Sequence, residues 1–307
     1  MLFDVIIIGG GPAGLTAGIY TSRARLKSLL IEKALAGGQV ATIDLIENYP
    51  GFDEGISGSE LSQKMERQAK RFGLEIIQSA VQKISLHGKI KKITLHENQV
   101  EYEAKSVIIS TGAHPKRLGI EGEEKLRGRG VSYCATCDGA LFKGEKIAVI
   151  GGGDSAVEEA IFLTRFAEIV YVVHRRDQFR AAKIAQERAF SNPKIKFIWN
   201  SAVKKIDGED SVTALRVKDV KTGKETTLDV QGVFIYVGYN PSTEFLKSIV
   251  NLNENNYILT DEDMATSVPG IFAAGDVRAK PLKQIATAVG DGAIAAISAE
   301  KYIEENF

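Results

Sequence analysis

The residues in this chain best suited to chemistry are two cysteines separated by two positions, Cys134 and Cys137. A Cys-x-x-Cys pair can close into a small disulfide ring, so it accepts or releases two electrons as a unit. Each of its thiolates can also attack another disulfide. The spacing therefore predicts a redox site.

Two other interpretations of the cysteine pair are weaker. A tetrahedral zinc site needs four ligands, and the chain offers only these two cysteines. Its histidines show no metal-ligand spacing near the pair: His87, His96, His114 and His174. A permanent disulfide is disfavoured because we expect a cytoplasmic protein, and cytoplasmic thiols stay reduced unless a catalytic cycle oxidises them. We therefore expect no metal site.

The expected compartment follows from the N-terminal residues and the charge balance. Residues 1–4 carry no basic region, and the apolar run 5–8 is too short for a signal core. No segment reaches the roughly 18 apolar residues of a membrane span. Lys plus Arg equals Asp plus Glu, at 39 each, so the net charge does not favour nucleic acid or an anionic membrane as partner.

A glycine-rich turn at 9–14 lies between a predicted strand, 4–8, and a predicted helix, 15–25. Gly9 permits the tight turn, Gly11 lets the backbone approach a pyrophosphate, and Gly14 allows close packing of helix on strand. The helix N-terminus then faces the phosphates with its partial positive charge. Glu32 ends the next strand, near the roughly twenty-residue spacing expected for an acid that binds ribose hydroxyls. This pattern predicts a dinucleotide site.

The same pattern recurs 142 positions later in the sequence. A strand at 146–150 precedes Gly151-Gly152-Gly153-Asp154-Ser155-Ala156, a helix at 157–166 and a strand at 169–173. Ala156 replaces the last glycine, and His174 replaces the acid. With Arg175, Arg176 and Arg180, His174 places cations where a 2′-phosphate would lie. The first site should therefore suit FAD and the second NADPH.

The order of the remaining segments predicts one domain inserted into another. Strands are expected at 72–78, 81–86, 91–95 and 107–111, and the turn 111–115 leaves the first domain. A strand at 233–237 leads through 238–241 back into it. Gly275 and Asp276 end a strand at 271–276, and a helix is expected at 285–302. Asp276 suits the ribityl chain of a flavin, or serves as an ordinary turn residue.

With these motifs placed, the whole chain resembles the bacterial-type, low-molecular-weight NADPH-dependent thioredoxin reductases. The resemblance rests on the two glycine turns, on 37–39, 47–51, 134–138, 174–180 and 275–276, and on 284–285. It implies an α/β fold of two Rossmann-like, three-layer ββα dinucleotide-binding domains. The FAD domain would comprise 1–113 plus 245–307, and the inserted NADPH domain with the dithiol would comprise 114–244.

The resemblance also implies which residues bind each cofactor. Those for FAD are Gly9, Gly11, Pro12, Ala13, Gly14, Glu32, Gly38, Gln39, Asn48, Thr111, Gly112, Gly275, Asp276, Gln284 and Ile285. Those for NADPH are Gly151, Gly153, Asp154, Ser155, Ala156, His174, Arg175, Arg176, Arg180 and Gly238. Cys134 would attack the partner, Cys137 would lie near the flavin, and Asp138 would move protons.

The implied activity is that of a thioredoxin-disulfide reductase, which passes electrons from NADPH through FAD and the dithiol to thioredoxin or a thioredoxin-like protein. The implied assembly is a homodimer, and the implied motion is a rotation of the inserted domain about 112–116 and 237–241. Asp138 followed by Gly139 also reads as simple turn chemistry. Many relatives carry two aromatic residues after this glycine, whereas this chain has Ala140 and Leu141.

The alternative is an NADPH-dependent flavin reductase component that serves another redox partner, such as a glutaredoxin-like protein, a peroxidase or a ferredoxin. A ferredoxin reductase needs no dithiol. A peroxidase partner of this kind would carry an additional N-terminal thioredoxin-like domain, and the chain begins at its first strand. A dinucleotide sensor without catalysis would have no need of the cysteines.

Overall fold

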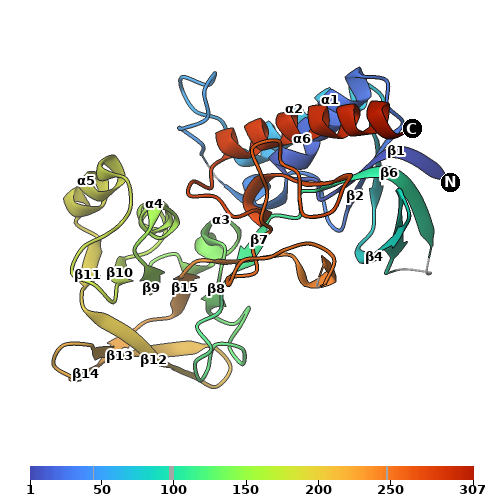
Figure 1. Ribbon diagram of the computed structural model, residues 1–307. Helices are drawn as coiled ribbons and strands as arrows, with labels where there is room; N and C mark the ends of the chain where they lie inside the picture. Colours follow the sequence, from blue (N-terminus) through green and yellow to red (C-terminus); the bar gives the residue numbers. More distant parts are fainter. Residues whose placement is uncertain (44, 97–99, 247) are drawn as a thin grey trace. The chain divides into compact units, whose positions relative to one another are not determined.

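The chain forms two compact units, shown in the computed structural model of Figure 1. Unit 1 comprises Met1–His114 and Asn240–Phe307, and unit 2 comprises Pro115–Tyr239. The structure describes residues 1–43, 45–96, 100–246 and 248–307. Within these ranges, none of the helices combines the length and the apolar character needed to cross a membrane.

Unit 1 is built on a sheet in the order β3-β2-β1-β6-β5-β4, with β17 also paired to β6. The pairs β3–β2, β2–β1, β1–β6 and β6–β17 are parallel, whereas the pairs β6–β5 and β5–β4 are antiparallel. The strands are β1 (Leu2–Ile8), β2 (Ser28–Glu32), β3 (Glu75–Gln78), β4 (Val81–His87), β5 (Ile90–Leu95), β6 (Glu101–Ile109) and β17 (Ile271–Ala273). The helices are α1 (Pro12–Arg23), α2 (Gly58–Arg71) and α6 (Ile285–Asn306), and the 3-10 turns are η1 (Gly38–Thr42), η3 (Glu244–Leu246) and η4 (Gly275–Val277).

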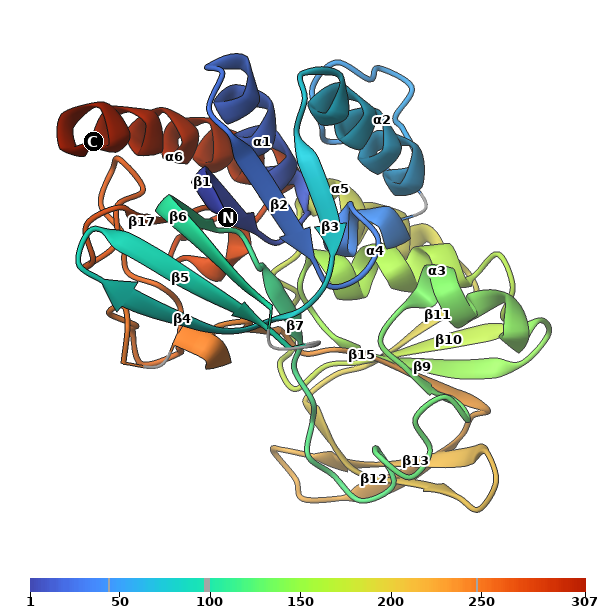
Figure 2. The ribbon, with the colours of Figure 1, turned by 90° about the vertical axis from the view of Figure 1, so that its right-hand side faces the viewer.

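Alternate residues of β1 face two different layers. Val5 and Ile7 pack with α1, α2 and α6 on one face, where Figure 2 shows the three helices together. Ile6 and Ile8 pack with β4, β5 and the chain around η3 on the other face. Because both faces of the parallel strands are covered, these strands read as continuous apolar runs.

Unit 2 repeats this layering on a smaller scale. Its parallel sheet has the order β11-β10-β9-β15-β8, and a separate antiparallel sheet has the order β12-β13-β14. The strands are β8 (Val131–Ser132), β9 (Lys146–Gly151), β10 (Ile169–Val173), β11 (Ile195–Ile198), β12 (Ser201–Gly208), β13 (Val212–Asp219), β14 (Glu225–Asp229) and β15 (Gly232–Tyr236). The helices are α3 (Ala135–Asp138), α4 (Asp154–Leu163) and α5 (Lys183–Ser191). A 3-10 turn, η2 (Gly139–Phe142), follows α3.

Two hydrophobic clusters cover the two faces of the parallel sheet in unit 2. Ile147 and Val149 of β9 pack with α4 and α5, whereas Ala148 and Ile150 pack with β12 and β13. Each unit thus has a helical layer, a central sheet and a second β layer. This confirms the predicted fold class, two Rossmann-like domains of the three-layer ββα kind.

The chain passes between the units twice, through β7 (Ala113–Pro115) and β16 (Tyr239–Pro241), which pair with each other. Gly112 and Gly238 flank these strands with φ values of +62° and +114°. A side chain is strained at such values, so glycine suits both positions.

One predicted element begins later than expected. The strand expected from residue 72 starts at Glu75, because Phe72 is the C-cap of α2 and its N–H donates to Ala69 O and Lys70 O. Gly73 follows at φ +98° and ends the helix in the usual way. The helix α2 itself, with Ser57 as a side-chain N-cap, had no counterpart in the sequence analysis.

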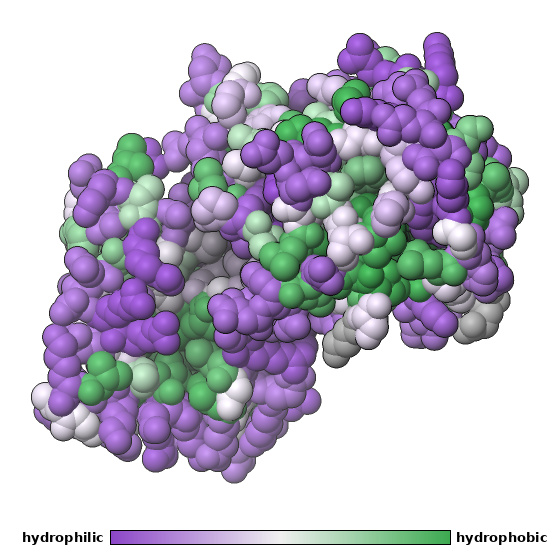
Figure 3. All heavy atoms as spheres, in the orientation of Figure 1, coloured by the Kyte–Doolittle hydropathy of each residue, from purple (hydrophilic) through white to green (hydrophobic). Residues whose placement is uncertain are grey.

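The molecular surface is mainly hydrophilic on the face drawn in Figure 3, with apolar side chains gathered in patches. The most exposed large apolar residues include Leu35, at 82%, and Leu141, at 78%. Leu141 lies in η2, directly after the helix that carries the cysteine pair.

Candidate functional site

Cys134 and Cys137 are joined by a disulfide within unit 2. Cys134 is the N-cap of α3, and its sulfur accepts a hydrogen bond from the Cys137 N–H at 3.2 Å. The Cys134 N–H donates to Ser132 Oγ at 3.0 Å. Cys137 is exposed and Cys134 is half-buried. The disulfide is thus held at the surface by a framework of backbone hydrogen bonds.

Asp138, the predicted acid, is the last residue of α3 and is half-buried. Its N–H donates to Cys134 O at 3.2 Å, so its backbone is tied to the first cysteine. Its position in the chain is directly after Cys137.

The segment before the cysteines is fastened by Glu123, a buried residue that the sequence analysis missed. Tyr133 Oη donates to Glu123 Oε1 at 2.6 Å, and the N–H groups of Leu118 and Gly119 donate to the same carboxylate. Burial acts to raise the pKa of Glu123, but these hydrogen bonds lower it below its ordinary value. An ionised Glu123 therefore anchors Tyr133 beside Cys134.

The first glycine turn has little room where the backbone folds on itself and open space where a ligand is expected. A Cβ on Gly9 would lie 2.3 Å from Ser110 O, and one on Gly14 would lie 1.9 Å from Gly9 O. A Cβ on Gly11 would meet nothing within 4 Å. Pro12 and Ala13 open α1 immediately after this gap. The cradle fits a pyrophosphate approaching the helix N-terminus.

Glu32 ends β2 and is buried against the turn. Its Oε2 accepts the Gly10 N–H at 2.6 Å, and its Oε1 accepts the Ala34 N–H at 3.0 Å. Because each carboxylate oxygen has two acceptor positions, Glu32 can hold the turn and still accept from a ribose.

Other predicted FAD residues lie around the same turn. A Cβ on Gly38 would lie 3.4 Å from Gly11 Cα. Hydrogen bonds connect the remaining loops: Gln39 Nε2 to Ala113 O, Asn48 Nδ2 to Gln284 Oε1 at 3.1 Å, and Thr111 Oγ1 to Ser242 O at 2.8 Å. Gln284 is the N-cap of α6, in a capping box with Thr287, and Ile285 begins that helix.

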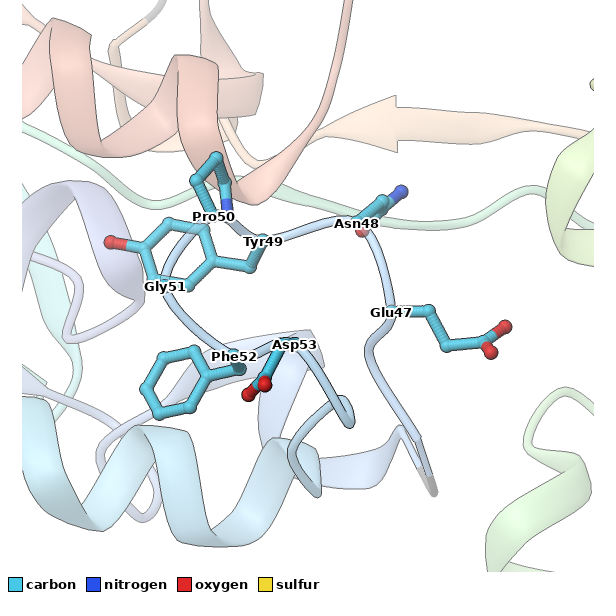
Figure 4. A pocket seen from close by; sticks show the side chains of 7 residues that line it. All are labelled: Glu47, Asn48, Tyr49, Pro50, Gly51, Phe52 and Asp53. Carbon is cyan, nitrogen blue, oxygen red and sulfur yellow. The ribbon is translucent and has the colours of Figure 1, made fainter.

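Asn48 belongs to a loop that borders a wide-open hollow of about 510 Å³, lined by Glu47, Asn48, Tyr49, Pro50, Gly51, Phe52 and Asp53. Figure 4 shows the rings of Tyr49 and Phe52 on one side of the loop and the side chains of Glu47 and Asn48 on the other. The two rings are stacked, with centroids 6.1 Å apart. The loop therefore turns a polar edge, including Asn48, away from its aromatic edge.

Asp276 lies in η4 of unit 1 and is half-buried, with its Oδ1 atom shielded from solvent. Burial raises the pKa of Asp276 above its ordinary value. Its Oδ1 has no hydrogen-bond partner among the described residues, and the nearest cation is Lys280 Nζ at 3.8 Å. A buried acceptor of this kind fits a hydroxyl-bearing ligand such as the ribityl chain of FAD.

Asp291 of α6 holds the turn that carries Asp276, and the sequence analysis did not identify it. It accepts hydrogen bonds from the Gly275 N–H at 3.0 Å, Arg278 Nη1 at 2.9 Å and Lys280 Nζ at 2.9 Å. A Cβ on Gly275 would lie 2.9 Å from Ala13 Cβ, so the turn also packs against α1. The available signal was an acid within the apolar first half of α6.

The second glycine turn has the same combination of tight and open positions. A Cβ on Gly151 would lie 2.3 Å from Tyr236 O, whereas one on Gly153 would meet nothing within 4 Å. Asp154 Oδ1 accepts the Ala182 N–H at 2.6 Å, and the Arg180 N–H donates to Gly152 O at 2.7 Å. These bonds hold the loop 174–182 on the turn. Ser155 is half-buried and Ala156 is buried in α4.

His174 differs from the three predicted arginines in its environment. Its ring is buried, with centroids 5.8 Å from Phe179 and 6.3 Å from Trp199, and a Cβ on Gly152 would lie 2.4 Å from it. Burial, and then Arg180, Arg176 and Arg175, lower the pKa of His174 below 6.5. His174 is therefore neutral at neutral pH, and the exposed Arg175, Arg176 and Arg180 carry the charge.

The chain matches the family of pyridine nucleotide-disulphide oxidoreductases over residues 3–292. It is 52% identical to a thioredoxin reductase of Listeria innocua, covering 99% of this chain and 95% of the relative. It is 51% identical to that of Bacillus subtilis, covering 99% and 96%. A crystal structure of Lactococcus lactis thioredoxin reductase matches with a TM-score of 0.97 and 50% identity over 99% of both chains. That of T. acidophilum matches with a TM-score of 0.93 and 39% identity, again over 99% of both chains.

Proposed function

The chain belongs to the thioredoxin reductase family within the pyridine nucleotide-disulphide oxidoreductases, and we propose that it reduces the disulfide of thioredoxin or a thioredoxin-like protein. It is a flavoprotein disulfide reductase that uses FAD and NADPH as cofactors. The observation that carries the proposal is the Cys134–Cys137 disulfide, held at the surface of a unit that also contains a glycine turn with three arginines.

FAD would be held by the first glycine turn, with Glu32 at the ribose and Asp276 at the ribityl chain. NADPH would be held by the second turn, with Arg175, Arg176 and Arg180 at the 2′-phosphate. The FAD domain would comprise residues 1–113 and 245–307, and the NADPH domain residues 114–244. When bound, NADPH supplies a hydride and FAD relays the electron pair to the disulfide.

The chain's own residues carry out the exchange with the partner. In the reduced enzyme the Cys134 thiolate attacks one sulfur of the partner disulfide, forming a mixed disulfide and releasing a partner thiolate. The Cys137 thiolate then attacks Cys134 Sγ, which restores the enzyme disulfide and releases the second partner thiolate. Asp138 would accept a proton from the attacking thiol and return it to a leaving thiolate.

The roles of the two cysteines can be separated by trapping. A Cys137→Ser enzyme should accumulate a mixed disulfide with thioredoxin through Cys134, because the resolving thiol is missing. A Cys134→Ser enzyme should not. If only the Cys134→Ser enzyme accumulated the mixed disulfide, Cys137 would be the attacking cysteine and Cys134 the resolving one.

The proposal also covers the surface that contacts thioredoxin, the rotation of the inserted domain, and the compartment and oligomeric state of the enzyme. Leu141, exposed beside the cysteine pair, would contact the partner in place of the two aromatic residues of many relatives. Gly112 and Gly238, both at positive φ, would act as hinges for rotation of the inserted domain. The enzyme would work as a cytoplasmic homodimer.

The experiment that tests this function is anaerobic stopped-flow reduction of the purified yellow enzyme by NADPH and by NADH, followed by oxidised thioredoxin. We expect rapid bleaching that favours NADPH, reversal by thioredoxin, and loss of turnover in Cys134→Ser with bleaching retained. Bleaching that thioredoxin fails to reverse would reject thioredoxin as the partner. No bleaching by NADPH would reject the donor.

A further inference from the structure

Tyr236 joins the second glycine turn to the helix that carries the cysteine pair. It is the last residue of β15, and its backbone pairs in register with Gly151 of β9. Its carbonyl oxygen would lie 2.3 Å from a Cβ on Gly151. The main chain of Tyr236 thus forms one wall of the turn where NADPH is expected.

The side chain of the same residue reaches the dithiol. Tyr236 Oη accepts a hydrogen bond from the Ala135 N–H at 2.8 Å, and Ala135 lies between the two cysteines in sequence. Ala135 is fully buried, at 0% exposure. It begins α3, where the first N–H groups have no acceptor within the helix. The tyrosine hydroxyl therefore supplies the partner of a buried N–H that would otherwise be unsatisfied.

Packing and charge keep this hydroxyl in place and neutral. The ring packs against the cluster that contains Phe142, Phe162 and Ala135. Burial, and then the nearby Glu159, raise the pKa of Tyr236 far above its ordinary value. The hydroxyl therefore stays protonated across the working pH range.

We propose that Tyr236 is a positioning residue for the redox pair, whose hydroxyl holds the backbone of Cys134–Cys137 in the geometry of the disulfide. The bond is present in the oxidised form. The proposal includes that this bond is weaker in the dithiol form, where the two sulfurs no longer constrain the backbone, so that the bond favours disulfide over dithiol. The inference rests on the proposed function for its biological meaning, but it concerns an equilibrium that needs neither NADPH nor thioredoxin.

The test compares Tyr236→Phe with the unchanged enzyme, both carrying FAD, in anaerobic dithiothreitol buffers of graded ratio. Dithiothreitol passes two electrons and two protons to the Cys134–Cys137 disulfide and becomes its own cyclic disulfide. Thiols are then counted by alkylation after an acid quench. We expect the equilibrium to shift about threefold to tenfold toward dithiol, the worth of one hydrogen bond. A tenfold shift corresponds to about 30 mV.

Tyr171→Phe is the matched control. Tyr171 lies on β10 of the same sheet, and its hydroxyl makes no hydrogen bond within the described ranges. It should leave the equilibrium unchanged. If Tyr236→Phe also leaves the equilibrium within twofold of the unchanged enzyme, the proposal is wrong.

A second variant tests whether the effect runs through the Ala135 N–H. Ala135→Pro removes this donor at the first position of a helix, where proline is tolerated. Cys134, before it, has φ −142° and ψ 101°, which suits a residue that precedes proline. In the Ala135→Pro background, Tyr236→Phe should add no further shift. An undiminished shift there would contradict the proposed contact.

Discussion

The two glycine turns share the same spacing of motif residues but differ in how much room each position leaves for a side chain. In unit 1 the last fingerprint position must be glycine, because a Cβ on Gly14 would lie 1.9 Å from Gly9 O. In unit 2 the same position is Ala156, and its Cβ would lie 2.7 Å from a Cβ on Gly151. The first glycine is thus tightly packed in both turns, at Gly9 and at Gly151, whereas the last position excludes a side chain only in unit 1. Helix α1 therefore approaches its strand more closely than a side chain would permit.

The residue at the end of the second strand supports the turn in both units. Glu32 accepts the Gly10 N–H, and the ring of His174 packs over Gly152. The first is an acceptor that also suits a ribose, while the second is a neutral, buried ring. We infer that nucleotide choice in unit 2 comes from Arg175, Arg176 and Arg180, and that His174 shapes the turn on which they stand.

The largest contrast should come from adding one methyl group to each turn. Gly14→Ala should prevent unit 1 from holding FAD and cost more than about 3 kcal/mol, because the methyl group would overlap backbone that cannot move. Gly153→Ala should fold and retain FAD, because a Cβ there is in open space. Bound flavin per chain and thermal unfolding measure both. Normal flavin content in Gly14→Ala would contradict the steric account.

A smaller effect is expected from Glu32→Gln. The amide keeps the size of the side chain but loses the charge and one acceptor, so the Gly10 or Ala34 N–H is left unpaired. FAD affinity should fall about 10-fold to 100-fold, the worth of a hydrogen bond to a charged group. Titration of the apoprotein with FAD gives the value. Glu75→Gln, at an exposed site on the neighbouring β3, should bind FAD normally.

The smallest effect should be a pH dependence of stability that arises in unit 2. The pKa of His174 is lower in the folded chain than its value of 6.5 when unfolded. The unfolded state therefore binds more protons near and below pH 6.5, and stability is lost as pH falls through this range. His174→Phe should weaken this loss. Melting curves from pH 8 to 5.5 test it, with His87→Gln on β4 as the control; equal slopes in both variants would argue against a role for His174.

The sequence allowed the glycine turns and the cysteine pair to be predicted because their signals are local. Each glycine satisfies a steric need within a few residues of itself, and Cys134 and Cys137 are neighbours. The contacts of Tyr236 with Ala135 and of Ser110 with Gly9 each join residues 101 positions apart. Such contacts depend on which strands become neighbours in the sheet, and no spacing in the sequence expresses them.

Burial explains the other differences between expectation and structure. His174 stands beside arginines in the sequence and was grouped with them, but folding places its ring among Phe179 and Trp199. Asp291 lies among apolar residues, and its three partners come from a turn that precedes its helix. The strands β12–β14 were not assigned from the sequence, although Gly208 ends β12 and Gly223 lies in the turn between β13 and β14.

The central claim, that two copies of one turn serve two different nucleotides, is tested most directly by the ratio of kcat/KM for NADPH to that for NADH. Replacing Arg175, Arg176 and Arg180 together with Ala should lower this ratio about 100-fold or more, through loss of charged contacts to the 2′-phosphate. NADH turnover and FAD content should be unchanged, and His174→Phe should keep most of the selectivity. A ratio that survives loss of all three arginines would contradict the account.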